Sequence, residues 1–112
     1  LGVDQFDCVL QTRLGRHGTA LTSQGRVNLK RSEFTLSSEP IDSTCSCSVC
    51  ARHTRGYIRH LFQVGEPTAS RLVSIHNIAW TLSLMDQMRN AIIAGRFEAL
   101  RQEILAVWGT AA

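Results

Sequence analysis

The sequence predicts a small α+β domain braced by a bound metal ion, and three observations support this. The first 30 of its 112 residues contain short apolar segments separated by glycines. Three of the four cysteines fall within residues 45–50, and from residue 54 onward apolar side chains recur at helical spacing. A hydrophobic fraction of 44% provides only a modest core for a chain of this length. A structural metal would therefore supply a large share of the stability.

The first 30 residues are expected to form a strand, a basic loop and a hairpin. Residues 2–10 combine apolar and acidic positions, which predicts a short strand. Residues 13–18 follow as a glycine-spaced basic loop. Segments 19–22 and 26–29 predict the two arms of a hairpin, whose turn contains Gly25, a residue that can adopt positive φ.

The rest of the chain is expected to contain a polar, turn-rich segment over residues 31–44, the cysteine cluster and three helices. Helical spacing of apolar residues predicts helices over 54–64, 68–94 and 97–108, the last two separated by Gly95. The long middle helix is expected to be amphipathic and to bury an apolar face that carries Leu72, Ile75, Ala79, Leu82, Met85, Met88 and Ile92.

The cysteine spacing is the strongest chemical signal in the chain. Cys45, Cys47 and Cys50 lie within six residues and cannot all pair as disulfides. Their spacing fits a tetrahedral zinc site in which a histidine is the fourth ligand, and the alternative is three thiols without a metal. A closed site of this kind is usually structural, so any catalytic group has to lie elsewhere.

Three histidines are candidates for the fourth ligand. His53 is nearest in sequence, His60 lies on the following helix, and His76 lies on the long helix. Spacing alone does not choose among them. The fourth cysteine, Cys8, lies far from the cluster, and we expect it to be a small core residue and not a ligand.

The first twenty residues also contain candidate reactive and binding groups. Asp4 and Asp7 are three residues apart, and on a strand they would face opposite sides and form no carboxylate pair. A carboxylate at the end of a strand is a common catalytic position in barrel enzymes, and the alternative is an aspartate that caps a loop. Arg13, Arg16 and His17 can recognise phosphates or bases, or can form a solvated loop.

Charge and composition limit the partners. The net charge is +3, and all of the twelve basic residues except Lys30 are arginines, which suit phosphate groups and base edges. The same net charge is also ordinary for a soluble domain. No apolar run approaches the roughly 18 residues of a membrane helix, nothing resembles a signal peptide, and clustered cysteines favour a reducing compartment. We expect a cytoplasmic protein without a membrane or DNA partner.

Six stretches carry a family resemblance: residues 2–10 (GVDQFDCVL), 12–18 (TRLGRHG), 45–50 (CSCSVC), 55–61 (RGYIRHL), 74–77 (SIHN) and 95–97 (GRF). In this order they resemble the C-terminal part of bacterial tRNA-guanine transglycosylase, also called queuine tRNA-ribosyltransferase. The resemblance covers nearly the whole chain, although the family enzyme is several times longer. It implies the C-terminal part of a (β/α)₈ TIM barrel with an inserted zinc-binding subdomain of β-hairpin, zinc turn and three helices.

The resemblance implies a pentosyltransferase of queuosine biosynthesis. Such an enzyme exchanges the wobble guanine in a tRNA anticodon loop for a 7-deazaguanine base, preQ1 or queuine, through a covalent ribosyl-enzyme intermediate. It implies that Asp7 is the nucleophile and that Arg13 and Arg16 read the bases beside the target guanosine. It also implies that His76 completes a structural zinc site with the three cysteines, and that a homodimer forms through the zinc region.

The same resemblance divides the chain into three segments. Residues 1–30 would be the last-strand catalytic segment with the basic loop and hairpin, residues 31–66 the zinc-binding subdomain, and residues 67–112 the barrel-closing helix and the terminal helix.

Gln11 stands where the family usually has proline, whose loss would loosen the approach to the arginines. The base-pocket and acid–base residues would lie upstream of Leu1, so we expect a piece of a longer protein that is inactive alone. The alternative is a non-catalytic zinc-stabilised RNA-binding module or partner subunit of the same family, against which the intact Asp7 argues.

Overall fold

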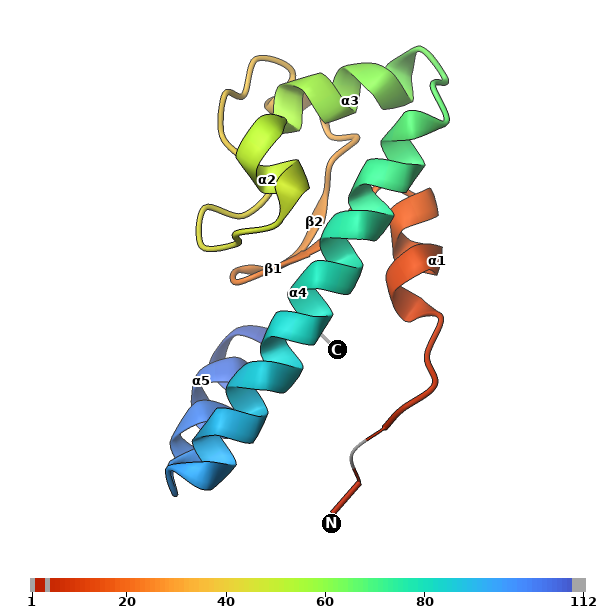
Figure 1. Cartoon of the computed structure of the whole chain (residues 1–112). Coiled ribbons are helices and arrows are strands. Elements are labelled where there is room, and N and C mark those ends of the chain that lie inside the picture. Colours follow the sequence, from red (N-terminus) through yellow and green to blue (C-terminus); the bar gives the residue numbers. More distant parts are fainter. Residues whose placement is uncertain (1, 4, 110–112) are drawn as a thin grey trace.

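The computed structural model describes residues 2–3 and 5–109, and its organising element is one long helix (Figure 1). The elements in chain order are α1 (Leu10–Arg16), β1 (Thr19–Thr22), β2 (Gly25–Asn28), the 3₁₀ helix η1 (Ser32–Phe34), α2 (Ser48–Arg52), α3 (Arg55–Gln63), α4 (Thr68–Ile93) and α5 (Phe97–Trp108). The helix α4 contacts α1, β1, α2, α3 and α5. Its first half carries the hairpin and the cysteine region, and α5 packs back on its second half. Within the described residues, no helix is both long and apolar enough to cross a membrane.

The hairpin is confirmed, with its second arm starting one residue earlier than expected. β1 and β2 pair antiparallel, with Thr22 opposite Gly25 and only Ser23 and Gln24 between them. Gly25 adopts φ +103°, as the turn requires. The Thr22 hydroxyl donates to the Gly25 carbonyl at 2.7 Å and accepts from the Gln24 amide at 3.1 Å. These bonds close the turn and fix the register of the sheet.

The hydrophobic core lies beside the cysteine region. Its buried members come from the hairpin region, the loop before the cysteines, and the helices α2, α3 and α4. They are Ala20, Leu29, Ile41, Val49, Ile58 and Val73. Cys47 and Cys50 pack against this core. The metal-ligand region and the core are therefore one packed unit, so the loss of one disturbs the other.

The strand expected over residues 2–10 is wrong. The described residues before Leu10 have no regular secondary structure, while Asp4 lies outside the described residues. A strand needs a neighbouring strand to receive its hydrogen bonds, and the two-stranded sheet of the described chain contains only β1 and β2. Without such cover, Phe6 is 69% exposed, and Val9 is exposed as well.

The basic loop expected over residues 13–18 is wrong up to residue 16, because α1 continues to that point. The reason is a tertiary contact that the sequence does not reveal. Gly15 is buried where α1 crosses α4, and a Cβ at this position would lie 2.8 Å from the Ser74 amide nitrogen. This glycine permits close helix packing, whereas Gly18, at φ +82°, forms the turn that follows.

The three helices expected after the cysteines are confirmed as α3, α4 and α5. The face that α4 buries differs from the expected one, because Ile75, Leu82 and Ile92 are exposed. The residues that α4 buries are Ala69, Val73, His76, Asn77 and Ala91. Two buried polar residues replace part of the expected apolar face, and an apolar surface of α4 stays uncovered by the described chain.

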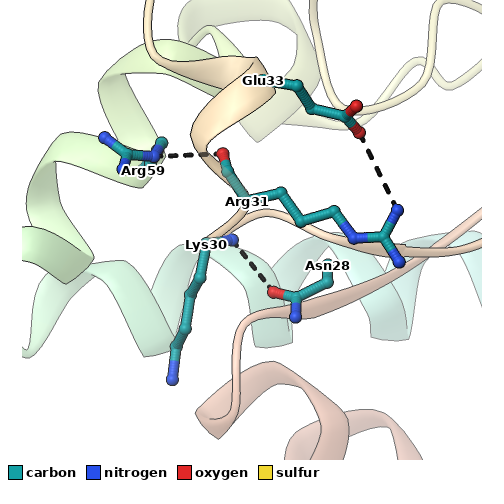
Figure 2. A network of polar contacts seen from close by, with 5 residues as sticks. All are labelled: Asn28, Lys30, Arg31, Glu33 and Arg59. Carbon is teal, nitrogen blue, oxygen red and sulfur yellow. Dashed lines mark hydrogen bonds and ion pairs between the residues drawn. The ribbon is translucent and has the colours of Figure 1, made fainter.

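A set of polar contacts joins the end of β2 to α3 (Figure 2). The Arg59 Nε donates to the Arg31 carbonyl at 3.0 Å, and the Lys30 amide donates to the Asn28 side chain at 3.0 Å. The Arg31 and Glu33 side chains form an ion pair at 3.9 Å, but both are largely exposed, so the pair adds little stability. The bond from Arg59 holds the residue before the 3₁₀ turn against α3.

Candidate metal centre

Four side chains converge at one point between α2 and α4. One ligand atom each from Cys45, Cys47, Cys50 and His76 lies within 4.8 Å of all the others. The Nδ1 of His76 is 3.5 Å from the Cys47 sulfur and 3.3 Å from the Cys50 sulfur. Three sulfurs and one imidazole nitrogen at this separation can surround a single metal ion tetrahedrally. The described structure therefore contains a candidate closed metal centre.

Two of the three candidate histidines lie outside this cluster. His53 stacks on Tyr57 with ring centroids 5.4 Å apart, and His60 lies in the last turn of α3. Only His76 among them joins the cluster of ligand atoms in the described chain. The fold makes the choice that spacing left open, because α4 brings residue 76 against the cysteine turn.

The cysteine turn is shaped by a short helix that the sequence analysis did not predict. Cys47 is the N-cap of α2, and its sulfur accepts a bond from the Cys50 amide at 3.4 Å. An N-cap and the residue three positions later lie on the same side of a helix start. This geometry brings the Cys47 and Cys50 sulfurs to the same side of the turn.

The carboxylate of Asp42 fixes the loop that leads into the cluster. Asp42 is only 4% exposed. It accepts bonds from the amide and hydroxyl of Ser23 at 2.7 and 3.2 Å, and from those of Thr44 at 2.9 and 2.7 Å. Its carbonyl also accepts the Cys45 amide at 3.1 Å. Asp42 is not among the residues singled out from the sequence, although Asp-Ser-Thr two residues after Pro40 is a typical side-chain turn pattern.

We expect Asp42→Ala to lower the free energy of unfolding by about 1–3 kcal/mol, because the partly buried bonds from the amides of Ser23 and Thr44 lose their acceptor. Burial disfavours the charged carboxylate, but the bonds from Thr44 and Ser23 outweigh it and lower the pKa of Asp42. Its contribution is therefore complete above the carboxyl's unfolded-state pKa and is lost as the pH falls through the lower folded-state value. Denaturant unfolding at pH 7 and at acidic pH checks both statements; equal losses at both pH values would contradict the second.

The orientation of His76 follows from its second ring nitrogen. The side chain is fully buried, and its Nε2 lies 2.7 Å from the Leu21 carbonyl oxygen. A carbonyl only accepts, so Nε2 carries the proton and the lone pair of Nδ1 faces the sulfurs. Burial lowers the pKa of His76, against the opposing effect of that carbonyl, and so favours the neutral form that binds metals.

The pKa values of the cysteine thiols indicate what kind of ion the cluster suits. Burial, aided by the neighbouring Cys47 and Cys45, raises the pKa of Cys50 to about 12. Burial also raises the pKa of Cys45. Three thiolates so close together are unfavourable unless a cation neutralises them. The donor set and its burial thus fit a thiophilic divalent cation.

The other candidate residues lie apart from this cluster. Asp7 is exposed in the segment before α1. Arg13 and Arg16 are exposed and three residues apart on α1, so they share one face of that helix. Cys8 is exposed, so the expectation of a core residue is wrong; it lies outside the cluster, as expected.

Comparison with known proteins places the chain in a family. A model of the family "Queuine tRNA-ribosyltransferase" matches residues 1–110. The chain is similar to the queuine tRNA-ribosyltransferase of Clostridium acetobutylicum, with 47% identity over 96% of this chain and 28% of the relative. It is 44% identical to that of Geobacillus kaustophilus, over 96% of this chain and 28% of the relative. It is 46% identical to that of Thermotoga maritima, over 97% of this chain and 30% of the relative. The chain thus spans less than a third of the length of these relatives. It belongs to the queuine tRNA-ribosyltransferase family.

Proposed function

We propose that this chain is the C-terminal portion of a tRNA-guanine transglycosylase, which replaces the wobble guanine of a tRNA anticodon with a 7-deazaguanine base. The observation that carries the proposal is the family match over residues 1–110. The four-ligand cluster supports it, because the resemblance had implied those same four residues. The test is capture of a covalent complex between tRNA and the full-length protein.

The metal in this proposal is one Zn²⁺ ion held by Cys45, Cys47, Cys50 and His76. Three thiolates and one imidazole favour zinc over harder cations. All four positions of a tetrahedron would be filled by protein, which leaves no place for substrate. The ion therefore supplies a cross-link between the cysteine turn and α4, and the bond-breaking chemistry belongs to other residues.

The reactive group in this proposal is the carboxylate of Asp7. One of its oxygens attacks C1′ of the ribose, the bond between C1′ and the guanine nitrogen breaks, and guanine leaves with a proton from a residue outside this chain. The incoming base then attacks the same carbon through nitrogen, gives up its proton and releases Asp7. Two inversions at C1′ retain the configuration. The exposure of Asp7 supports this role, because a nucleophile must reach a nucleotide that has left its stack.

Arg13 and Arg16 would contact the RNA beside the target guanosine. Their shared face on α1 allows both forked guanidinium groups to point the same way, and both are exposed. Single-stranded anticodon bases present the edges that such groups can bind. The proposed ligand is therefore an opened anticodon loop and not a duplex.

We expect Arg13→Ala and Arg16→Ala each to weaken binding of a tRNA anticodon stem-loop by about tenfold, since one base contact is worth roughly 1–3 kcal/mol. Arg89→Ala serves as the matched control, because Arg89 is an exposed arginine on α4. The measurement is a binding titration with the full-length protein at fixed salt concentration. An equal loss in the Arg89 variant would indicate nonspecific charge attraction and contradict the assignment.

The architectural part of the proposal is that this chain closes a (β/α)₈ barrel. A groove between the N-terminal segment and α4 is lined by Gln5, Phe6, Cys8, Gln11, Ile78, Thr81, Leu82 and Met85. Leu82 is 64% and Phe6 69% exposed in this groove, so the two contribute to one apolar patch and not to scattered exposed positions. The remaining barrel elements would cover it.

The proposed segment roles follow the chain. Residues 1–30 would supply the nucleophile and the base-reading arginines, residues 31–66 most of the zinc subdomain, and residues 67–112 the barrel-closing and terminal helices. A homodimer through the zinc region is part of the same proposal. Tyr57, half exposed and stacked on His53, offers an aromatic surface there.

A further inference from the structure

Asn77 is a buried polar residue to which the proposed chemistry gives no role. It directly follows the candidate ligand His76 on α4, and it is fully buried. A buried amide is costly unless its oxygen and both hydrogens have partners. The partners that Asn77 finds therefore indicate what this residue holds in place.

Those partners come from two other elements of the fold. The Asn77 Oδ1 accepts from the Leu21 amide at 2.9 Å. Its Nδ2 donates to the Thr19 carbonyl at 3.0 Å and to the Gln11 carbonyl at 3.1 Å. The first two bonds reach β1, and the third reaches the first turn of α1. One side chain of α4 thus joins α1 and β1, both of which lie far from it in the sequence.

The neighbouring residue on α4 binds the same strand. The His76 Nε2 donates to the Leu21 carbonyl at 2.7 Å, so both backbone groups of Leu21 bond to α4 side chains. These bonds occupy the edge of β1 that β2 does not pair. A continuous set of contacts therefore runs from the sulfur cluster through His76 and Leu21 to Asn77 and on to Gln11.

The helix α1 depends on such contacts for its position. It has seven residues, too few for a helix to be stable alone in water. Besides Asn77, its anchors on α4 are the close approach at Gly15, the bond from the Gln11 side chain to Thr81 at 3.3 Å, and the bond from the Ser70 hydroxyl to the Arg16 carbonyl at 3.3 Å. Of the side chains that bond to α1 within residues 2–3 and 5–109, only Asn77 is both fully buried and adjacent to a candidate metal ligand.

We infer that Asn77 is a positioning residue that ties α1 to the metal centre and so sets the direction in which Arg13 and Arg16 point. The part that concerns the arginines rests on the proposed function, whereas the mechanical link between the metal centre and α1 does not. Asn77 touches neither RNA nor metal in this scheme. It acts through the backbone of α1.

Hydrogen exchange in the full-length protein tests the mechanical link. Asn77→Asp keeps the side-chain shape and the acceptor for Leu21 but removes both donors. Asn90→Asp makes the same change at an exposed position on the same helix and is the matched control. In the wild type, chelation of the metal should speed exchange of the α1 amides by tenfold or more, because the core that holds α1 depends on the metal. In Asn77→Asp these amides should exchange about tenfold faster than in the metal-loaded wild type with the metal still bound, while Asn90→Asp behaves as wild type.

Slow α1 exchange in metal-loaded Asn77→Asp would overturn the inference. If the buried charge expels the metal, Asn77→Ala removes the donors without a charge and decides the same comparison. Loss of the metal from both variants would also overturn it, because Asn77 would then support the metal site itself and not the link to α1.

Binding of a tRNA anticodon stem-loop tests the effect on the arginines. Asn77→Asp should raise the Kd about tenfold in the wild-type background and leave it unchanged when Arg13 and Arg16 are already alanine. Independent, additive losses would overturn the role in arginine positioning. If the wild type bound no stem-loop at all, the proposed function would fail, and the exchange data would still decide whether Asn77 holds α1.

Discussion

Replacing Asp7 with asparagine in the full-length protein is expected to abolish the covalent complex with tRNA and to lower the rate of base exchange by roughly a thousandfold or more, as for the loss of other nucleophiles. An amide is nearly the same size as a carboxylate but has no negative charge with which to capture C1′. Asp7 is exposed and lies outside the metal cluster, so the metal content and folding should stay as in the wild type. Denaturing electrophoresis of the trapped complex and incorporation of labelled base measure the two effects.

The matched control is Asp86→Asn, the same change at an exposed position on α4. It should leave the covalent complex and the exchange rate unaffected. A complex that persists in the Asp7 variant would remove Asp7 from the role of nucleophile. Tight tRNA binding by the wild type without any covalent complex would favour a non-catalytic RNA-binding module of the same family.

Replacing Cys50 with serine is expected to empty the metal site and to unfold the core around it. A serine hydroxyl is a poor zinc ligand because it stays protonated at neutral pH. Zinc binding by small cysteine and histidine sites contributes about 10–16 kcal/mol, whereas whole domains are stable by about 5–15 kcal/mol. Since Cys50 packs against the core, the loss should spread into the hairpin and α3. Metal analysis and thermal unfolding measure the outcome.

Cys8→Ser provides the matched control, because Cys8 is exposed and lies outside the cluster. That variant should keep both the metal and the melting temperature. If Cys50→Ser retained its metal and melted within a few degrees of the wild type, a structural role for the site would be contradicted.

Local patterns predicted the elements whose geometry is decided locally. The hairpin follows from Gly25, which reaches positive φ at the turn. The start of α3 follows from Thr54, whose side chain accepts the Tyr57 amide and caps the helix. The spacing of apolar residues predicted α4 and α5 within about a residue at each end. In each case the signal and the structure it specifies lie within a few residues of one another.

Errors occurred where distant parts of the chain decide the outcome. The apolar residues before Leu10 have the composition of a strand, but a strand also needs a partner to pair with. Gly15 was interpreted as a loop residue, whereas its lack of a side chain lets α1 approach Ser74 on α4. No window of a few residues around Gly15 contains that information.

The candidate metal site was predictable in kind but not in full detail. The cysteine spacing indicated the metal, whereas the choice of His76 came from a family resemblance and from the fold. Hydropathy would not place His76 and Asn77 in the interior, because their burial depends on the backbone of Leu21 and the nearby sulfurs. For Asp42, the turn with Thr44 has a local signal, whereas the bonds to Ser23, which lies on the hairpin turn, have none.

The central claim is that one zinc ion joins the cysteine turn to α4 through three sulfurs and the imidazole of His76. X-ray absorption at the zinc edge on the wild-type full-length protein, combined with metal analysis, tests it most directly. The account predicts one zinc per chain, with three sulfur neighbours at about 2.3 Å and one nitrogen at about 2.0–2.1 Å. A folded protein without zinc, or a spectrum that shows only oxygen and nitrogen neighbours, would contradict it.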